Sequence, residues 1–147
     1  MVNKLILLLS FLLLTCSPAD VSTKANTQVF KSFKLDSGIF TTDISVIVSS
    51  DAVLVNKLLI DKYNITIDAK DLLVADGYTF SDNNVCVLWL SSVSNTPYDK
   101  AKISHELFHV TAYILSYHGV KLDLSSEEVF AYELDYLTEQ FYNNYGK

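Results

Sequence analysis

The sequence predicts one small α+β domain: a mainly antiparallel sheet with one helix between its strands, followed by a C-terminal helix pair. Short runs rich in β-branched residues are separated by turn residues as far as residue 92. After residue 96, two long stretches carry apolar residues at helical spacing. The chain has 147 residues and half of them are apolar, which is enough to bury a single core.

The first residues predict export from the cytoplasm. Residues 1–15 join a short start with one lysine to the apolar run LILLLSFLLL, which is typical of a signal peptide. The run ends in LLTC and resembles a bacterial lipobox, which implies that Cys16 is lipidated and becomes the new N-terminus. Thr15 departs from the small residue usual at that place, so simple secretion and an uncleaved anchor are the alternatives. We therefore expect a signal peptide at 1–15, a lipidated cysteine and flexible tether at 16–27, and a single domain at 28–147.

The sheet is predicted from short segments in the first two thirds of the chain. Strands are expected at 28–35, 43–50 and 83–92, a helix at 51–64, a short strand edge at 65–68, and a turn signal within 75–80. The strand at 83–92 is apolar on both faces, so we expect it to lie centrally or to be covered on both sides.

Two helices are predicted to close the chain. The first has Thr96 as its N-cap and Pro97 at its first position, and it ends at Gly119. The second begins in SSEE and runs to about Tyr142. Because the link between them is short, we expect an antiparallel or steeply crossed pair.

The first of these helices carries the motif H-E-x-x-H. His105 and His109 are four residues apart, so they project from one face and can bind one Zn²⁺ at ~2.0–2.1 Å. Glu106 is rotated away from the metal and can face a metal-bound water instead. There it would act as the general base and then pass the proton to the leaving amine.

A catalytic zinc needs a third protein ligand, and the local pattern offers two glutamates. Glu127 and Glu128 open the second helix, whereas His118 lies on the wrong side of the first. Ser125 and Glu128 also fit a capping box, and a glutamate that caps a helix is not free to bind metal. The residues alone do not choose between Glu127 and Glu128.

From about residue 85 to residue 142 the chain resembles small H-E-x-x-H metallopeptidases found in phages and prophages. The resemblance is carried by VLWL, ISHELFHVTAYIL, HGVKLD and EEVFAYELDYL. That family is similar to the zincins, whose second helix supplies a glutamate ligand within E-x-x-A-Y. This pattern falls on Glu128, Ala131 and Tyr132, so the resemblance implies a minimal zincin-like fold with Glu128 as third ligand and Glu127 as the alternative. The family is associated with the cytoplasm, and the leader of this chain departs from it, which leaves the substrate open.

The predicted function is that of a zinc-dependent metallopeptidase-like hydrolase acting on a peptide or protein. An extended substrate could pair with the strand at 85–91 if that strand has an exposed edge. The alternative is a non-catalytic envelope lipoprotein that acts by binding, through a structural metal site or as a phage-encoded protein that blocks a surface receptor.

The predicted partners and location follow from charge and from the leader. The net charge is −6 and the 11 basic residues are all lysine, which excludes a nucleic-acid-binding surface. We expect a monomer held to the outside of a bacterial membrane by its lipid, or else a secreted protein.

Overall fold

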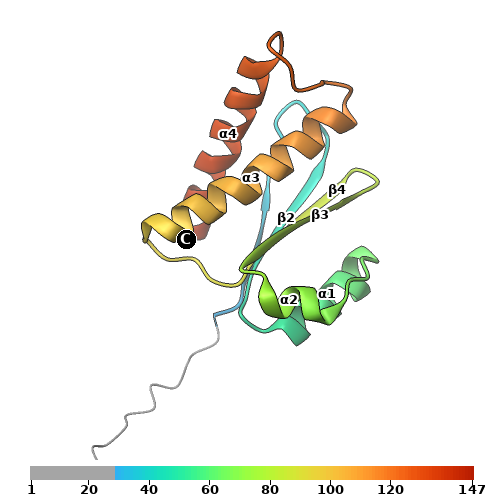
Figure 1. Ribbon diagram of the computed structural model, residues 1–147, viewed down its shortest axis with the longest axis vertical. Coiled ribbons are helices and arrows are strands. Elements are labelled where there is room, and N and C mark those ends of the chain that lie inside the picture. The colour runs from blue at the N-terminus through green and yellow to red at the C-terminus, as the bar shows by residue number, and fades with distance from the viewer. Residues whose placement is uncertain (1–28) are drawn as a thin grey trace, which may run out of the picture.

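The computed structural model describes residues 29–147, in which four strands and four helices follow one another (Figure 1). The elements are β1 (Lys31–Leu35), β2 (Asp43–Val48), α1 (Ala52–Tyr63), α2 (Ala69–Val74), β3 (Gly77–Asp82), β4 (Val85–Leu90), α3 (Pro97–Tyr117) and α4 (Glu127–Tyr145). The predicted leader, Cys16 and the tether lie outside the described residues. Within residues 29–147, no helix is both long enough and apolar enough to cross a membrane.

The strands form one mixed sheet in the order β1-β2-β4-β3. The outer pairs β1–β2 and β3–β4 are antiparallel, and the central pair β2–β4 is parallel. The predicted α+β class is confirmed, including a mainly antiparallel sheet and a C-terminal helix pair. β4 lies between β2 and β3, so its predicted central position is also confirmed.

Helices cover both faces of the sheet (Figure 1). Because side chains alternate along a strand, β4 contributes Leu88 and Leu90 to the core beneath α3 and α4, and Val87 and Trp89 to the core on the α1 side. The apolar character of both faces of β4 therefore follows from its two covering layers.

Two expectations for this part of the chain are wrong: the strand edge at 65–68, and the single helix between the strands, because both α1 and α2 lie between β2 and β3. Residues 65–68 form no strand; Asp68 is instead the N-cap of α2, and its side chain accepts a hydrogen bond from the backbone N of Lys70 at 2.9 Å. The turn signal within 75–80 coincides with a bend at Asp76, and β3, which was not expected, begins directly after it at Gly77. β3 pairs with β4 through a two-residue turn at Asn83 and Asn84, whose φ angles of 44° and 65° suit a tight hairpin.

Because β3 pairs with β4, β3 and not β4 is the strand with a free edge on this side of the sheet. Both sides of β4 are paired, by β2 and by β3, so the strand at 85–91 has no exposed edge among the described residues. β3 is the edge strand on that side of the sheet. An extended partner can therefore reach the sheet there at β3, and not at β4.

Candidate metal centre

α3 begins and ends where its capping residues predict. The side chain of Thr96 accepts a hydrogen bond from the backbone N of Asp99 at 3.2 Å, and Pro97 occupies the first turn. His118 is the C-cap and Gly119 follows with a φ of 83°, a conformation that favours glycine. One face of the helix packs on the sheet, which leaves the H-E-x-x-H residues at the edge of that contact.

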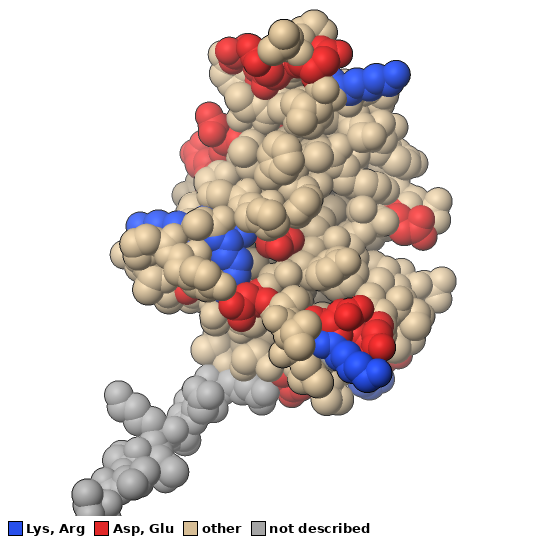
Figure 2. Space-filling model, in the orientation of Figure 1, with Lys and Arg blue, Asp and Glu red and all other residues tan. Residues whose placement is uncertain are grey.

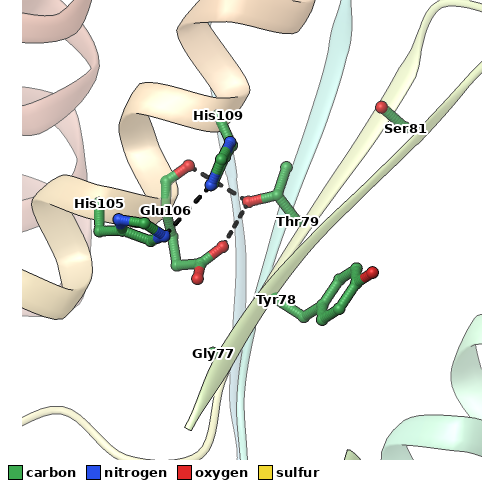
Figure 3. Close-up of a pocket in the computed structure, with 7 residues that line it drawn as sticks. All are labelled: Gly77, Tyr78, Thr79, Ser81, His105, Glu106 and His109. Atoms are coloured by element: carbon green, nitrogen blue, oxygen red, sulfur yellow. Dashed lines mark hydrogen bonds between the residues drawn. The ribbon is translucent and has the colours of Figure 1, made fainter. Parts of the chain in front are cut away.

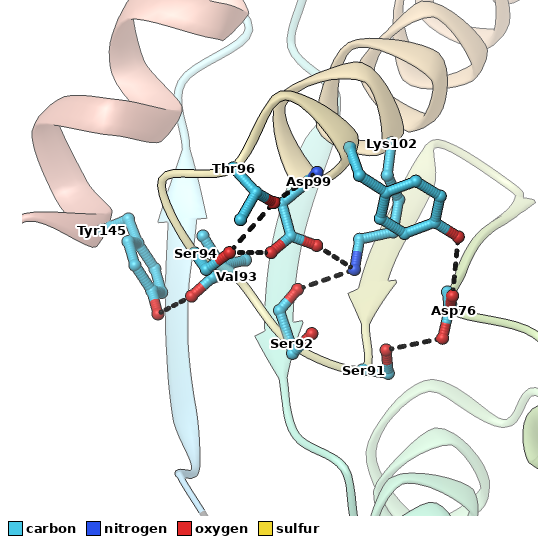
Figure 4. A network of polar contacts seen from close by, with 10 residues as sticks. Asp76, Ser91, Ser92, Val93, Ser94, Thr96, Asp99, Lys102 and Tyr145 are labelled. Carbon is cyan, nitrogen blue, oxygen red and sulfur yellow. Dashed lines mark hydrogen bonds and ion pairs between the residues drawn. The ribbon is translucent and has the colours of Figure 1, made fainter.

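A buried ion pair anchors the first turns of α3 (Figure 4). Asp99 and Lys102 lie 2.8 Å apart with both side chains almost completely buried, and Lys102 also donates to the carbonyl of Ser92 at 2.9 Å. Hydrogen bonds from Lys102 and then from Ser94 lower the pKa of Asp99 below its usual range. The start of α3 is thereby fixed against the loop that leaves β4.

The two motif histidines lie side by side on the exposed surface of α3 (Figure 3). Their Nε2 atoms are 3.2 Å apart and their ring centroids are 4.7 Å apart. Two nitrogens at about 2.05 Å from a tetrahedral ion lie about 3.3 Å from each other, so His105 and His109 fit two positions of one zinc ion. The same contact is a hydrogen bond when only one of the two nitrogens carries a proton.

Glu106 lies beside them, points toward β3 and is buried between α3 and β3 (Figure 3). Its Oε2 accepts a hydrogen bond from the Thr79 hydroxyl at 2.8 Å, and the same hydroxyl lies 3.2 Å from the Glu106 carbonyl oxygen. Beside it, a Cβ added at Gly77 would stand 3.1 Å from Glu106 Cγ, which is tighter than ordinary packing. A carboxylate next to the histidine pair is thus held by one hydroxyl and given room by one glycine.

A cleft of about 510 Å³ opens between α3 and β3 at this place. It is lined by Gly77, Tyr78, Thr79, Ser81, His105, Glu106 and His109 (Figure 3). β3 contributes small side chains toward α3, whereas Phe80 packs in the opposite core. The cleft therefore combines two potential metal ligands, a potential base and an adjacent strand edge.

The glutamates predicted to complete the site are elsewhere. Glu127 and Glu128 are exposed in the first turn of α4 and do not line the cleft. Figure 2 shows acidic side chains gathered at the top of the molecule, where Figure 1 places the link between α3 and α4. Among residues 29–147, no group of three His, Cys, Asp or Glu side chains stands close enough to hold a metal ion. The structure brings His105, Glu106 and His109 together, and it does not bring Glu128 to them.

The capping box that competed for Glu128 is not formed either. The N-cap of α4 is Ser126, and no side-chain capping hydrogen bond is present there among the described residues. Ser125 donates both its backbone N–H and its hydroxyl to Asp123 Oδ1, so its side chain is engaged inside the link. In the described residues, Glu128 therefore neither caps α4 nor lies beside the histidine pair.

Four lining residues on β3 were not predicted as site residues. Gly77, Tyr78, Thr79 and Ser81 belong to a segment that the Asp-Gly pair at 76–77 made look like a turn. The available signal was the alternation in GYTFSD, followed by an Asn pair able to close a hairpin onto the strongest strand.

Comparisons of the chain with models of known families, with curated proteins and with solved structures found no match.

Proposed function

We propose that this chain is a zinc-dependent peptide hydrolase whose chemistry takes place in the α3–β3 cleft. The observation that carries the proposal is the pairing of His105 and His109, with Nε2 atoms 3.2 Å apart, beside the buried carboxylate of Glu106. The minimal zincin-like reading and the resemblance to phage-type H-E-x-x-H metallopeptidases belong to the same proposal.

His105 and His109 hold the metal, and Glu106 moves the proton. When bound, zinc supplies a Lewis acid that lowers the pKa of water and polarises a carbonyl oxygen. Glu106 accepts the proton of the attacking water at its carboxylate and delivers it to the leaving amine nitrogen. Thr79 keeps one oxygen of that carboxylate in place.

The free edge of β3 supports an extended peptide as the substrate. A chain that pairs with β3 receives backbone hydrogen bonds along the strand and passes His105 and Glu106 in the same cleft. This replaces the earlier expectation of pairing at residues 85–91.

Glu128 remains the proposed third ligand, with Glu127 as the alternative, although neither is adjacent to the pair in the described residues. The proposal requires α4 to present one of them to the histidines when metal binds. Zinc content of Glu128→Ala and Glu127→Ala, measured by mass spectrometry on the full-length chain in detergent, assigns the ligand. Loss of zinc in one variant alone identifies it, and full zinc in both removes α4 from the site.

The decisive test of catalysis is Glu106→Gln, which keeps size and hydrogen bonding but removes the base. We expect zinc content to stay unchanged and peptide hydrolysis to fall by about 10²–10⁴-fold. His105→Ala and His109→Ala should lose both zinc and activity. Equal hydrolysis by Glu106→Gln and the unchanged chain would sink the proposal.

A non-catalytic binding protein is the second candidate, and the lack of a three-ligand group in residues 29–147 favours it. In that reading the chain is an envelope lipoprotein with a structural metal site, or a phage-encoded surface protein that blocks a host receptor. The phenotype of the receptor-blocking protein should survive loss of both histidines, whereas the phenotype of a hydrolase should not.

We also propose that lipid on Cys16 attaches the chain to the outer side of a bacterial membrane. Incorporation of labelled palmitate into the unchanged chain, and its absence in Cys16→Ser, tests this directly. Release of unlabelled protein into the medium would favour the secreted alternative.

A further inference from the structure

Thr79 makes an unusual contact for an edge-strand residue, because it reaches the neighbouring helix instead of solvent. Its Oγ lies 2.8 Å from Glu106 Oε2 and 3.2 Å from the Glu106 carbonyl oxygen. A threonine hydroxyl has one proton, and the charged, closer carboxylate oxygen is the stronger acceptor. Within the described residues, this is the only hydrogen bond recorded for the Glu106 side chain.

Gly77, two residues earlier on β3, defines the other side of Glu106. A Cβ at this position would meet Glu106 Cγ at 3.1 Å and Glu106 Oε1 at 3.4 Å. The stem of Glu106 therefore lies against bare backbone. With Oε2 bonded to Thr79, Oε1 is the carboxylate oxygen left for proton transfer.

The start of β3 is fixed relative to α3 at a second point. Asp76, just before Gly77, accepts a hydrogen bond from the Tyr98 hydroxyl in the first turn of α3 at 2.8 Å. Its carbonyl accepts from the backbone N of Ser91 at 2.9 Å, and its other carboxylate oxygen accepts from the Ser91 hydroxyl (Figure 4). These contacts keep Gly77 and Thr79 from sliding along the helix.

We infer that β3 positions the general base: Thr79 is a positioning residue that fixes the Glu106 carboxylate, and Gly77 keeps the space that its free oxygen needs. The inference rests on the proposed hydrolase function and adds to it a role for two residues outside the H-E-x-x-H motif. Fixing matters because a glutamate side chain has several rotatable bonds, and misplacing a reacting group by about 1 Å can cost about 10²-fold in rate.

Thr79→Val removes the hydroxyl while keeping the shape of the side chain, and Thr79→Ser restores it. With fluorescein-labelled casein as the probe and the full-length chain loaded with zinc, we expect Thr79→Val to lower kcat by about 10–100-fold with little change in KM. Thr79→Ser should return kcat to within about threefold of the unchanged chain. Thr66→Val is the matched control, because it makes the same substitution at an exposed threonine that does not line the cleft, and it should leave kcat unchanged.

The position of the Glu106 carboxylate in crystals tests the role of Thr79 without a measurement of activity. In metal-free crystals of Thr79→Val, the Glu106 carboxylate should leave the place it holds in the unchanged chain, and in Thr79→Ser it should return there. Gly77→Ala should displace the Glu106 stem while zinc content stays the same.

The two proposals fail in different ways. The hydrolase proposal fails if Glu106→Gln retains full hydrolysis or if the unchanged chain shows none. In that case the crystal comparison still tests whether Thr79 fixes the Glu106 carboxylate. If Glu106→Gln is inactive but Thr79→Val keeps full kcat, or Glu106 does not move in its crystals, the positioning role is overturned. A Thr79→Ser variant as impaired as Thr79→Val overturns it too, because the hydroxyl is then not the relevant group.

Discussion

The two edges of the sheet, β1 and β3, are built in opposite ways. β1 carries Lys31 and Lys34, which protect an edge against pairing with another chain. Lys31 bonds the backbone oxygen of Tyr145 in α4 and lies over its ring, 4.7 Å from the centroid. β3 has no lysine and no charged residue before Asp82, and its inner face borders the cleft.

The end of β1 is also hydrogen-bonded to α4. The backbone N of Asp36 donates to Gln140 Oε1 at 2.9 Å, and Gln140 Nε2 donates to the Asp36 carbonyl at 2.6 Å. β3 is hydrogen-bonded to α3 through Thr79 and Glu106, side chains that belong to the candidate site. The β1 edge is thus closed by α4, whereas the β3 edge stays free beside the cleft, as the proposed hydrolase function requires.

The largest effect on stability should come from the β1 side. Phe141 is fully buried on α4 and meets the Phe33 ring edge-on at 5.6 Å. Phe141→Ala should lower the free energy of unfolding by about 3–5 kcal/mol through lost burial and a new cavity. Urea unfolding measures it, with the exposed neighbour Tyr142→Ala as control. A loss under 1 kcal/mol would contradict the view that packing of α4 on β1 stabilises the fold.

The anchor that holds α3 over β3 should come next. Lys102→Met leaves the buried carboxylate of Asp99 without its cation, and we expect a loss of about 3 kcal/mol at pH 7. Lys100→Met, exposed on the same helix, should change the free energy of unfolding by less than about 0.5 kcal/mol.

The same anchor predicts a dependence on pH. Because the pKa of Asp99 is lowered in the folded chain, its contribution to stability is present above the ordinary aspartate pKa of 3.8 and is lost as pH falls through the lower pKa of the folded chain. Urea unfolding of Asp99→Asn and of the unchanged chain should therefore converge at low pH. A constant difference between pH 7 and pH 3 would contradict the lowered pKa.

A smaller and opposite pH effect is expected near the end of β1. Burial, and then the charge of Asp36, raise the pKa of Glu133 to about 6. A raised carboxyl pKa makes the folded chain most stable below the ordinary glutamate pKa of 4.5, and this stability is lost as pH rises through about 6. Glu133→Gln should thus stabilise the chain at pH 7.5 by on the order of 1 kcal/mol and have little effect at pH 4.

The control for Glu133 is Glu139→Gln, an exposed glutamate on the same helix. It should show no difference between the two pH values in urea unfolding. Equal stabilisation by Glu133→Gln at both would exclude a raised pKa as the cause.

The smallest effect should come from the exposed ion pair between Lys34 and Asp43 on the β1 edge. Its coupling free energy in a double-mutant cycle with Lys34→Gln and Asp43→Asn should stay below about 0.5 kcal/mol. A coupling above 1 kcal/mol would mean that the β1 lysines act in stability as well as in protecting the edge.

Local chemistry made α1, α3, α4 and β4 predictable, but not the short helix α2. Thr96, Pro97 and Gly119 mark the ends of α3 by capping rules that need no tertiary information. β4 is apolar on both faces because helices cover both, so its central position was visible in its composition.

β3 and the third ligand depend on contacts that the local pattern does not contain. Only Phe80 of the six β3 residues is buried, and the Asp-Gly pair before it favours a turn, so the strand becomes evident only when it pairs with β4. The place of Glu128 depends on how α4 crosses α3, which packing against β1 decides. Thr79 could not be connected with Glu106, because 27 residues separate them in the chain.

The alternation of β3 has a consequence for how the molecule can vary. Residues 77, 79 and 81 face the cleft, while Phe80 between them packs against the core on the other side of the sheet. A substitution at Ser81, which does not bond Glu106, can therefore reshape the cleft without touching that core, whereas Gly77 and Thr79 both contact the proposed base. The same six-residue strand thus packs the sheet with one face and borders the cleft with the other, and Ser81 is the position at which the cleft can change while the sheet and Glu106 stay in place.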